Sequence, residues 1–234
     1  MKISLINSSF YFTYIFLITT GTICFIEALR NPDPKIRHIM NLETCISVVA
    51  GYFYGIFVDK VINKNKDKDK DSNKKHDNND EDTTPYEEIN DMRYTDWMIS
   101  TPLMLLVLCL VLSYENKIPV NMFTFISILV FNVLMLGSGY MGEINKIPKN
   151  IATVLGYVFF VILYGIIWKV FLTGKRTSQS VIIYLLFVIL WGFYGVFYMM
   201  DKITKVIGYN ILDLLAKAFV GIFFWLYLTK SLTL

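Results

Sequence analysis

Long apolar stretches separated by short polar connections dominate this chain of 234 residues. A helix needs about 20 apolar residues to cross a bilayer, because each residue advances it by about 1.5 Å. Seven stretches meet or approach this length, and each predicts a membrane-spanning helix: Phe10–Leu29, Met40–Ile62, Glu88–Leu112, Ile118–Met141, Ile151–Phe171, Ser180–Met200 and Val206–Leu228. The pattern therefore predicts an all-α membrane protein in which residues 1–234 form a single seven-helix domain.

The connection at about residues 63–84 is longer and more polar than the others. Between Lys64 and Asp82 it holds six lysines and seven acidic residues, so its net charge is near zero. Such a run has no apolar surface to bury, and we expect a flexible, solvated loop. Its carboxylates alternate as in a calcium-binding loop. The glycine and the final glutamate of an EF-hand are missing, however, so we expect no metal site.

Composition agrees with this architecture and excludes other classes of protein. Hydrophobic residues make up 55% of the chain and charged residues 18%, whereas soluble domains have about 25% charged residues. A net charge of +3 is too small and too scattered for a nucleic-acid-binding face, so we expect no nucleic-acid partner. More basic residues lie in the connections after the first, third and fifth segments than in the others. This bias predicts an N-terminus outside and a C-terminus in the cytoplasm.

Several ionisable side chains lie inside the predicted spans, where they are costly and mark functional sites by default. Lys217 is near the middle of the seventh segment, and Asp213 precedes it by four residues on the same helical face. The third segment contains Arg93 and Asp96, and the second contains Glu43. A buried lysine is commonly kept for imine formation with an aldehyde. A protonated imine needs a carboxylate counterion, so this set of charges indicates an aldehyde chromophore, although the charges of the third segment are also compatible with a structural ion pair.

Four motifs, in the correct order, resemble those of microbial (type 1) rhodopsins. Arg93–Leu103 reads RYTDWMISTPL, similar to the R-Y-x-D-W-x-x-T-x-P-L of the family's third helix. Asp213–Lys217 is similar to the D-x-x-x-K of the seventh helix, and Trp191–Tyr194 to the W-x-x-Y of the sixth. Met135–Gly139 reads MLGSG, similar to the M-x-G-T-G that lies against the retinal ring. Jointly these motifs are far more specific than any one of them.

The resemblance implies all-trans retinal bound to Lys217 as a Schiff base. It implies that Asp96 is the primary counterion and proton acceptor, that Asp213 is the second counterion, and that Arg93 shapes the outward half-channel. Ser100 stands where the family usually has threonine, and we expect its hydroxyl to bond the counterion. The residues expected to contact the retinal are Tyr94, Trp97, Ser100, Thr101, Met135, Gly139, Trp191, Tyr194 and Tyr198.

Departures from the proton-pump pattern favour a different activity. Outward pumps carry a proton-donating carboxylate eleven residues after the counterion, where this chain has Val107. The second segment instead carries a polar stripe that includes Glu43 and Tyr54. Together with Ser9 and Asn210, Glu43 would line a water-filled cation path, although such residues also tie helices together through hydrogen bonds. The combination resembles the rhodopsins of large DNA viruses of algae, particularly the channel-type group.

The leading hypothesis is therefore a retinal-based, light-gated cation channel, gated by photoisomerisation and deprotonation of the Schiff base. The intact counterion set also fits a weak light-driven outward proton pump, and the missing donor fits a photosensor that acts through a separate transducer. We expect a multi-pass protein in the cell membrane of the host cell, without enzymatic activity. Its expected partners are the lipid bilayer and monovalent cations or protons, and a homo-oligomer is compatible with the sequence.

Overall fold

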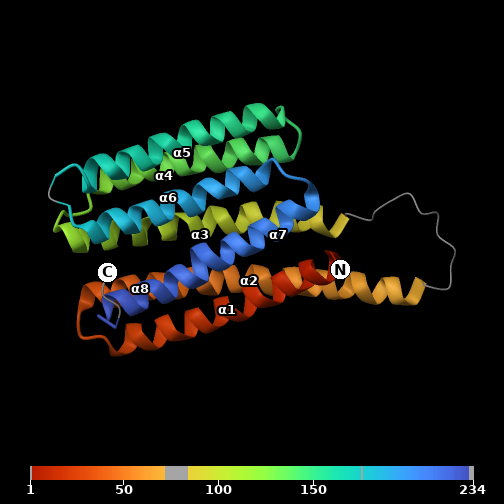
Figure 1. Ribbon diagram of the computed structural model, residues 1–234, viewed down its shortest axis with the longest axis horizontal. Helices are drawn as coiled ribbons and strands as arrows, with labels where there is room; N and C mark the ends of the chain where they lie inside the picture. Colours follow the sequence, from red (N-terminus) through yellow and green to blue (C-terminus); the bar gives the residue numbers. More distant parts are fainter. Residues whose placement is uncertain (1, 72–83, 175, 232–234) are drawn as a thin grey trace.

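The computed structural model describes residues 2–71, 84–174 and 176–231, and within these ranges it contains helices and no strands. The helices lie side by side along the long axis of the molecule (Figure 1). They are α1 (Lys2–Arg30), α2 (Pro34–Asp71), α3 (Thr84–Asn116), α4 (Met122–Glu143), α5 (Lys149–Phe171), α6 (Ser178–Tyr198), α7 (Lys202–Asp213), the π-helical turn η1 (Leu214–Phe219) and α8 (Val220–Leu228). In the described residues, seven stretches are long and apolar enough to cross a membrane, with α7, η1 and α8 forming one of them. The prediction of a seven-helix membrane protein is confirmed.

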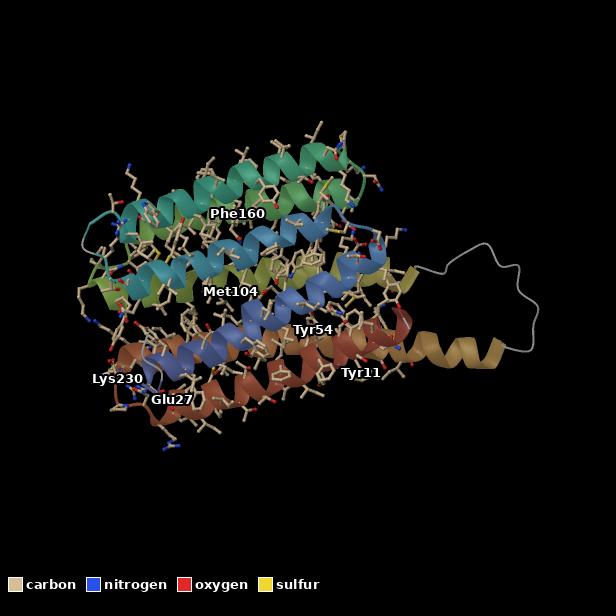
Figure 2. The ribbon with its side chains drawn as sticks, in the orientation of Figure 1. Tyr11, Glu27, Tyr54, Met104, Phe160 and Lys230 are labelled. Atoms are coloured by element: carbon tan, nitrogen blue, oxygen red, sulfur yellow. The ribbon has the colours of Figure 1, made fainter. Side chains whose placement is uncertain are left out.

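The two ends of the chain lie at opposite ends of the bundle, which we call its N-terminal end and its C-terminal end (Figure 1). Helices α1 and α2 pack together on one side, and α4 and α5 on the other. Between these pairs lie α3, α6 and the seventh span (Figure 1). Side chains from all the spans fill the interior, whereas Glu27 and Lys230 lie near the C-terminal end (Figure 2).

Side-chain caps decide where three of the helices begin. The side-chain oxygens of Asn121, Thr177 and Asp201 accept hydrogen bonds from backbone N–H groups in the first turns of α4, α6 and α7. Each cap satisfies a donor that has no partner inside the helix. The predicted start at Ile118 was therefore wrong, because α4 begins only after its cap. The predicted end at Met200 was also too late, because α6 ends before it.

The predicted loop at 63–84 was wrong in its first part. Helix α2 does not end at Ile62 but continues to Asp71, and α3 begins at Thr84. A helix satisfies its own backbone hydrogen bonds, so it can extend past the apolar span without packing against anything. The sequence here also repeats lysine three residues before aspartate, a spacing at which opposite charges support a helix. Residues 72–83 lie outside the described part of the chain.

The two sides of the bundle interior differ in polarity. At the C-terminal end, α3 buries a run of apolar side chains against α5 and α6, including Leu105, Val107 and Leu108. Glu43 and Tyr54 are both buried on α2, so the polar stripe on this helix faces the interior as predicted. Polar groups thus gather between α1, α2 and the seventh span, while the wall formed by α3, α5 and α6 is apolar.

The seventh span changes its hydrogen-bonding pattern where it carries its lysine. Lys217 lies in η1, a π-helical turn, which is a local feature common at functional sites. Helix α1 is tied to this region through two buried threonines. Thr13 donates to the carbonyl of Asn210 at 3.0 Å, and Thr20 donates to the carbonyl of Ala218 at 3.2 Å. These bonds hold the lysine-bearing turn in a defined position against α1.

Candidate functional site

Lys217 extends from η1 into the centre of the bundle, where its side chain is buried. Its Nζ lies 2.6 Å from Asp96 Oδ2 on α3 and 3.5 Å from Asp213 Oδ1, one turn earlier on its own span. Charges at such a depth persist only when they are paired and hydrogen-bonded. The structure therefore places Asp96 as the nearer carboxylate and Asp213 as the second one.

Arg93 holds Asp213 from the N-terminal end of the bundle. Its Nη1 donates to Asp213 Oδ2 at 3.1 Å, and its Nη2 donates to Asn210 Oδ1. The hydroxyls of Tyr54 and Tyr194 donate to the two Asp213 oxygens at 2.8 and 2.7 Å. The Arg93 guanidinium carbon also lies 5.1 to 5.8 Å from the centroids of four rings, Phe10, Tyr54, Phe57 and Tyr209. Donors from α2, α3 and α6 thus stabilise Asp213 as an anion.

Asp96 has fewer partners than Asp213. Its Oδ2 accepts from Lys217, but its Oδ1 has no hydrogen-bond partner within the described part of the chain. The buried Ser100 hydroxyl, one turn later on α3, has none there either, so the predicted bond between Ser100 and Asp96 is not formed. Serine lacks the β-branch that restricts the rotamer of threonine, so its hydroxyl is less firmly directed. One oxygen of Asp96 therefore remains open to receive a proton.

A cavity between α3, α4, α5, α6 and the seventh span includes Lys217 in its lining. All of the predicted contact residues except Ser100 line this cavity: Tyr94, Trp97, Thr101, Met135, Gly139, Trp191, Tyr194 and Tyr198. Gly139 leaves room for a neighbouring ring, because a Cβ at this position would lie 3.1 Å from the hydroxyl oxygen of Tyr94. The motifs of α3, α4 and α6 thus converge on one space around the lysine.

The sequence motifs did not reveal several of the lining residues. Those left unpredicted are Met104, Leu136, Ala152, Thr153, Gly156, Tyr157, Phe160, Gly195 and Tyr209. Tyr209 packs edge-on against Trp97 with ring centroids 5.0 Å apart. It precedes Asp213 by four residues, as Asp213 precedes Lys217, so helical spacing could have placed it on the site's face. The α5 residues carried no comparable signal, because α5 is apolar on all sides.

A buried amide joins α3 to α4 beside the cavity. Asn132 Nδ2 donates to Thr101 Oγ1 at 2.8 Å, and that hydroxyl donates to the carbonyl of Trp97 at 2.6 Å. Both Asn132 and Thr101 are buried, so the bond is shielded from competition with water. The pair fixes the helix turn that carries Trp97 relative to α4.

The structure divides the predicted ion-path residues between the two halves of the bundle. Asn210 Nδ2 donates to Ser9 Oγ at 2.8 Å, so these two residues meet on the N-terminal side of Lys217. Glu43 lies on the opposite side, where a Cβ added at Gly221 would be 3.1 Å from its Oε2. The three residues thus lie at different depths along the bundle, on either side of Lys217. A glutamate placed early on α2 reaches only the C-terminal half, because α1 and α2 run in opposite directions.

Comparison with known proteins identifies the chain. Residues 5–231 match the family model described as bacteriorhodopsin-like protein. The chain belongs to this family. The rhodopsin is also 30% identical to Opsin-1 of Neurospora crassa over 156 residues, which are 58% of this chain and 48% of that protein. The match thus spans about half the length of this curated relative.

Solved structures support the same assignment. The rhodopsin is similar to viral rhodopsin OLPVRII, with 45% identity, a TM-score of 0.83, and coverage of 98% of this chain and 100% of that one. It shares its fold with xanthorhodopsin, described as a light-driven ion pump with dual chromophore, at 21% identity and a TM-score of 0.71 over 96% and 92% of the two chains. The predicted resemblance to viral rhodopsins is confirmed.

Membership of this family implies a retinal chromophore, and the residues around Lys217 fit it. The cavity offers an amine for an aldehyde, two tryptophans, and a glycine at Gly139 where a Cβ would meet a tyrosine. Its lining is dominated by aromatic and aliphatic side chains, which suit a polyene. Lys217 would hold the retinal, and Trp97 and Trp191 would pack along it. Replacing Lys217 with alanine should therefore abolish the visible absorption that retinal produces with the protein.

Proposed function

We propose that this rhodopsin is a light-driven transporter that carries protons from the C-terminal end of the bundle to its N-terminal end. With the predicted orientation, this transport is outward. The observation that carries the proposal is Glu43, a buried carboxyl group in the half of the bundle that must resupply the proton. Sequence reasoning favoured a channel because Val107 stands where pumps carry a donor. Our candidate for a donor is Glu43 on another helix, α2.

The first step is loss of a proton from Lys217 Nζ. Bound retinal supplies the light-absorbing group whose isomerisation changes the position of this nitrogen. Asp96 is the acceptor best placed to receive the proton, because its Oδ2 lies 2.6 Å away and its Oδ1 has no partner in the described chain. Asp213 is the poorer acceptor, since Arg93 and two tyrosine hydroxyls already stabilise its negative charge.

The exit side is polar and closed by specific contacts. Arg93 lies between the two carboxylates and the N-terminal end, with Asn210 and Ser9 beyond it. When Asp96 becomes neutral, the negative charge near Arg93 decreases. The guanidinium is then less strongly held and can turn toward the polar groups nearer the N-terminal end. Nearer the end of the bundle, Lys205 of α7 is paired with Glu143 of α4. These groups form a route by which a proton leaves.

Reprotonation requires an acid in the other half. In the described chain the buried acidic side chains are Glu43, Asp96 and Asp213, and the last two already face Lys217. Glu43 Oε2 lies beside Gly221, which follows Lys217 by one turn, a separation of about 6 Å along the helix axis. Glu43 is therefore the one described buried acid left to return a proton to the lysine nitrogen.

The surroundings of Glu43 suit this role. Its side chain is 2% exposed, and the structure gives its carboxyl group no ion pair or hydrogen bond with any described residue. An unpaired charge at this depth is costly, which favours a carboxyl group that holds its proton until it can deliver it. Ser47, one turn closer to the level of Lys217, is buried and its hydroxyl has no described partner. It can therefore relay a proton between the two groups.

The test is light-driven pH change in vesicles that contain the purified protein with retinal. We expect a pH change on illumination that a protonophore abolishes. Glu43→Gln should slow recovery of the dark state by about 100-fold, the loss typical when a positioned proton donor is removed. Azide, a small diffusible acid, should restore the rate. The control is Glu27→Gln, because Glu27 accepts hydrogen bonds from Asn31 and Trp225 at the end of the bundle. Unchanged recovery in Glu43→Gln would refute the assignment.

A light-gated cation channel is the second candidate, supported by the polar contacts between α1, α2 and α7. Ser9, Asn210 and Tyr54 form a connected chain of hydrogen bonds that reaches Arg93. Loosening these bonds after deprotonation would admit water and monovalent cations. Whole-cell recording under light separates the candidates. A current that reverses with the cation gradient indicates a channel, whereas an outward current of constant sign indicates a pump.

The same recording also tests for a third class of activity. A coloured protein that produces neither current nor pH change would instead be a photosensor with a separate transducer. We place the protein in the cell membrane of the host cell, in the lipid bilayer, with protons or monovalent cations as its cargo and a homo-oligomer as a compatible assembly. We propose no enzymatic activity for it.

A further inference from the structure

The retinal cavity reaches the side of the bundle between α5 and α6. Four of its lining residues, Thr153, Gly156 and Tyr157 on α5 and Gly195 on α6, are only partly buried. The side chains that flank this stretch are apolar and exposed: Val158, Phe193 and Val196. A surface of this kind within two membrane spans faces the acyl chains of the bilayer. The cavity thus borders on lipid, and not only on the protein interior.

Tyr157 lies across this border. Its hydroxyl donates to the carbonyl of Gly192 on α6 at 2.9 Å. A Cβ at Gly195 would lie 2.6 Å from Tyr157 Cζ and from its hydroxyl oxygen, so the ring rests directly on the α6 backbone. Gly195 makes this position possible, since any side chain there would push the ring away. Tyr157 therefore closes the gap between the two helices with one neutral hydrogen bond.

The gap has defined edges. Toward the N-terminal end, Thr153 Oγ1 contacts Met199 Sδ at 2.9 Å. On α6 this contact lies seven residues beyond Gly192, or about 10 Å along the helix axis. Gly156 lies between the two contacts on α5, and a Cβ there would meet only the carbonyl oxygen of Met135, at 4.0 Å. Gly156 itself therefore leaves space beside Tyr157, whose ring packs edge-on against Phe160 on the same helix with centroids 6.2 Å apart.

We propose that Tyr157 is a side door through which retinal enters the cavity of Lys217 from the bilayer. Retinal is an apolar polyene that partitions into membranes, so it arrives from the lipid. Entry from the N-terminal end would have to pass the Glu143–Lys205 ion pair and Arg93 with its carboxylate. Entry past Tyr157 breaks one neutral hydrogen bond and separates no charges. The proposal rests on the retinal of this family and does not depend on the proposed transport.

The experiment measures colour formation in membranes from cells that made the full chain without retinal. Retinal is added from lipid vesicles, and the rate at which the visible band appears is recorded. Gly156→Phe should slow it at least about tenfold, the factor that a barrier raised by about 1.4 kcal/mol produces. The matched control is Gly165→Phe on the same helix, where a Cβ meets nothing within 4 Å and the position is exposed. Tyr157→Ala should have the opposite effect and speed colour formation.

Each outcome decides the proposal. Slower uptake in Gly156→Phe, with the Gly165→Phe rate unchanged, supports it. Equal rates in all the variants would overturn the proposal. The opening beside Tyr157 would then be assigned to a lipid chain or another apolar molecule. If Gly156→Phe stays colourless even when retinal is present during synthesis, the rate of Tyr157→Ala decides, and a rate equal to that of the unmodified protein overturns the proposal. Loss of transport would leave these rates untouched, so the two proposals fail separately.

Discussion

Gly208 of α7 lies so close to α6 that a single added methyl group should displace the seventh span. A Cβ there would lie 2.1 Å from Phe197 Cδ1 and 2.4 Å from Phe197 Cγ, whereas ordinary contacts exceed 3.4 Å. Because Cγ is the root of the ring, turning the ring about its own axis does not relieve the clash. Gly208→Ala should therefore separate α7 from α6. This movement would draw Asp213 away from the hydroxyl of Tyr194, which lies 2.7 Å from it.

Two opposing effects set the change in the free energy of unfolding caused by Gly208→Ala. Overpacking of this kind costs about 1–3 kcal/mol, while replacing glycine by alanine inside a helix gains about 1 kcal/mol. Gly137→Ala on α4 isolates the second effect, because a Cβ there meets nothing within 4 Å. The difference in the free energy of unfolding between the two variants should thus be about 1–3 kcal/mol in favour of Gly137→Ala. For a chain of this size, this corresponds to roughly 2–12 °C in Tm.

The assay is thermal denaturation of the retinal-loaded protein, followed by loss of the visible band. Gly208→Ala should lose its colour at a lower temperature than Gly137→Ala. Its band should also shift in position, because the contact between Tyr194 and Asp213 is altered, while the band of Gly137→Ala should not. Equal midpoints and equal spectra for the two variants would show that the α6–α7 contact is not as tight as the structure indicates, and would refute the reasoning.

Three further predictions concern hydrogen-bonding side chains. Asn132→Leu removes the donor to Thr101 and should lower the free energy of unfolding by about 1 kcal/mol, measured by the same thermal assay. Tyr54→Phe removes a hydroxyl that bonds two charged groups and should cost about 1.5–3 kcal/mol in that assay; a midpoint equal to the unmodified protein's would contradict the proposed anchoring of the second carboxylate. The side chain and backbone N–H of Thr204 donate to Asp201 at the start of α7 and lower the pKa of this carboxyl group below 3.8. A lowered pKa in the folded state gives stability that is present above the unfolded value and is lost as pH falls through the folded one. The destabilisation caused by Asp201→Ala should therefore be present at neutral pH and shrink below about pH 4; a gap in Tm that stays constant down to pH 2 would contradict it.

The sequence alone determined the membrane architecture and the chemistry at its centre. Seven apolar runs of spanning length leave a chain few alternatives to seven helices, because backbone groups in lipid must bond within their own helix. Lys217, Asp96, Asp213 and Arg93 were found as charges in places where charge is costly. Helical spacing was enough to put Lys217 and Asp213 on one face.

The sequence did not determine which of these groups touch. The family resemblance implied Asp96 as the primary counterion, and the packing of α3 against the seventh span places it nearer than Asp213 to the lysine. The same packing shows that the Ser100 hydroxyl does not reach its predicted partner. The sequence also did not show how the polar residues of the spans are distributed along the bundle. Glu43 and Asn210 were predicted to line one path, and only the antiparallel course of the helices shows that they lie on opposite sides of Lys217.

The tertiary structure also decided the role of apolar and small residues. In a soluble protein, polar residues mark the outer face of a helix, but lipid is as apolar as the interior of this bundle. The pattern along α5 therefore could not show that Gly156 and Tyr157 border the cavity while Gly165 faces outward. Asn132 was missed for a related reason, since it has its effect through Thr101 on another helix. The length and the charge of each span can be read from the sequence. Which faces of the spans meet depends on how the helices pack.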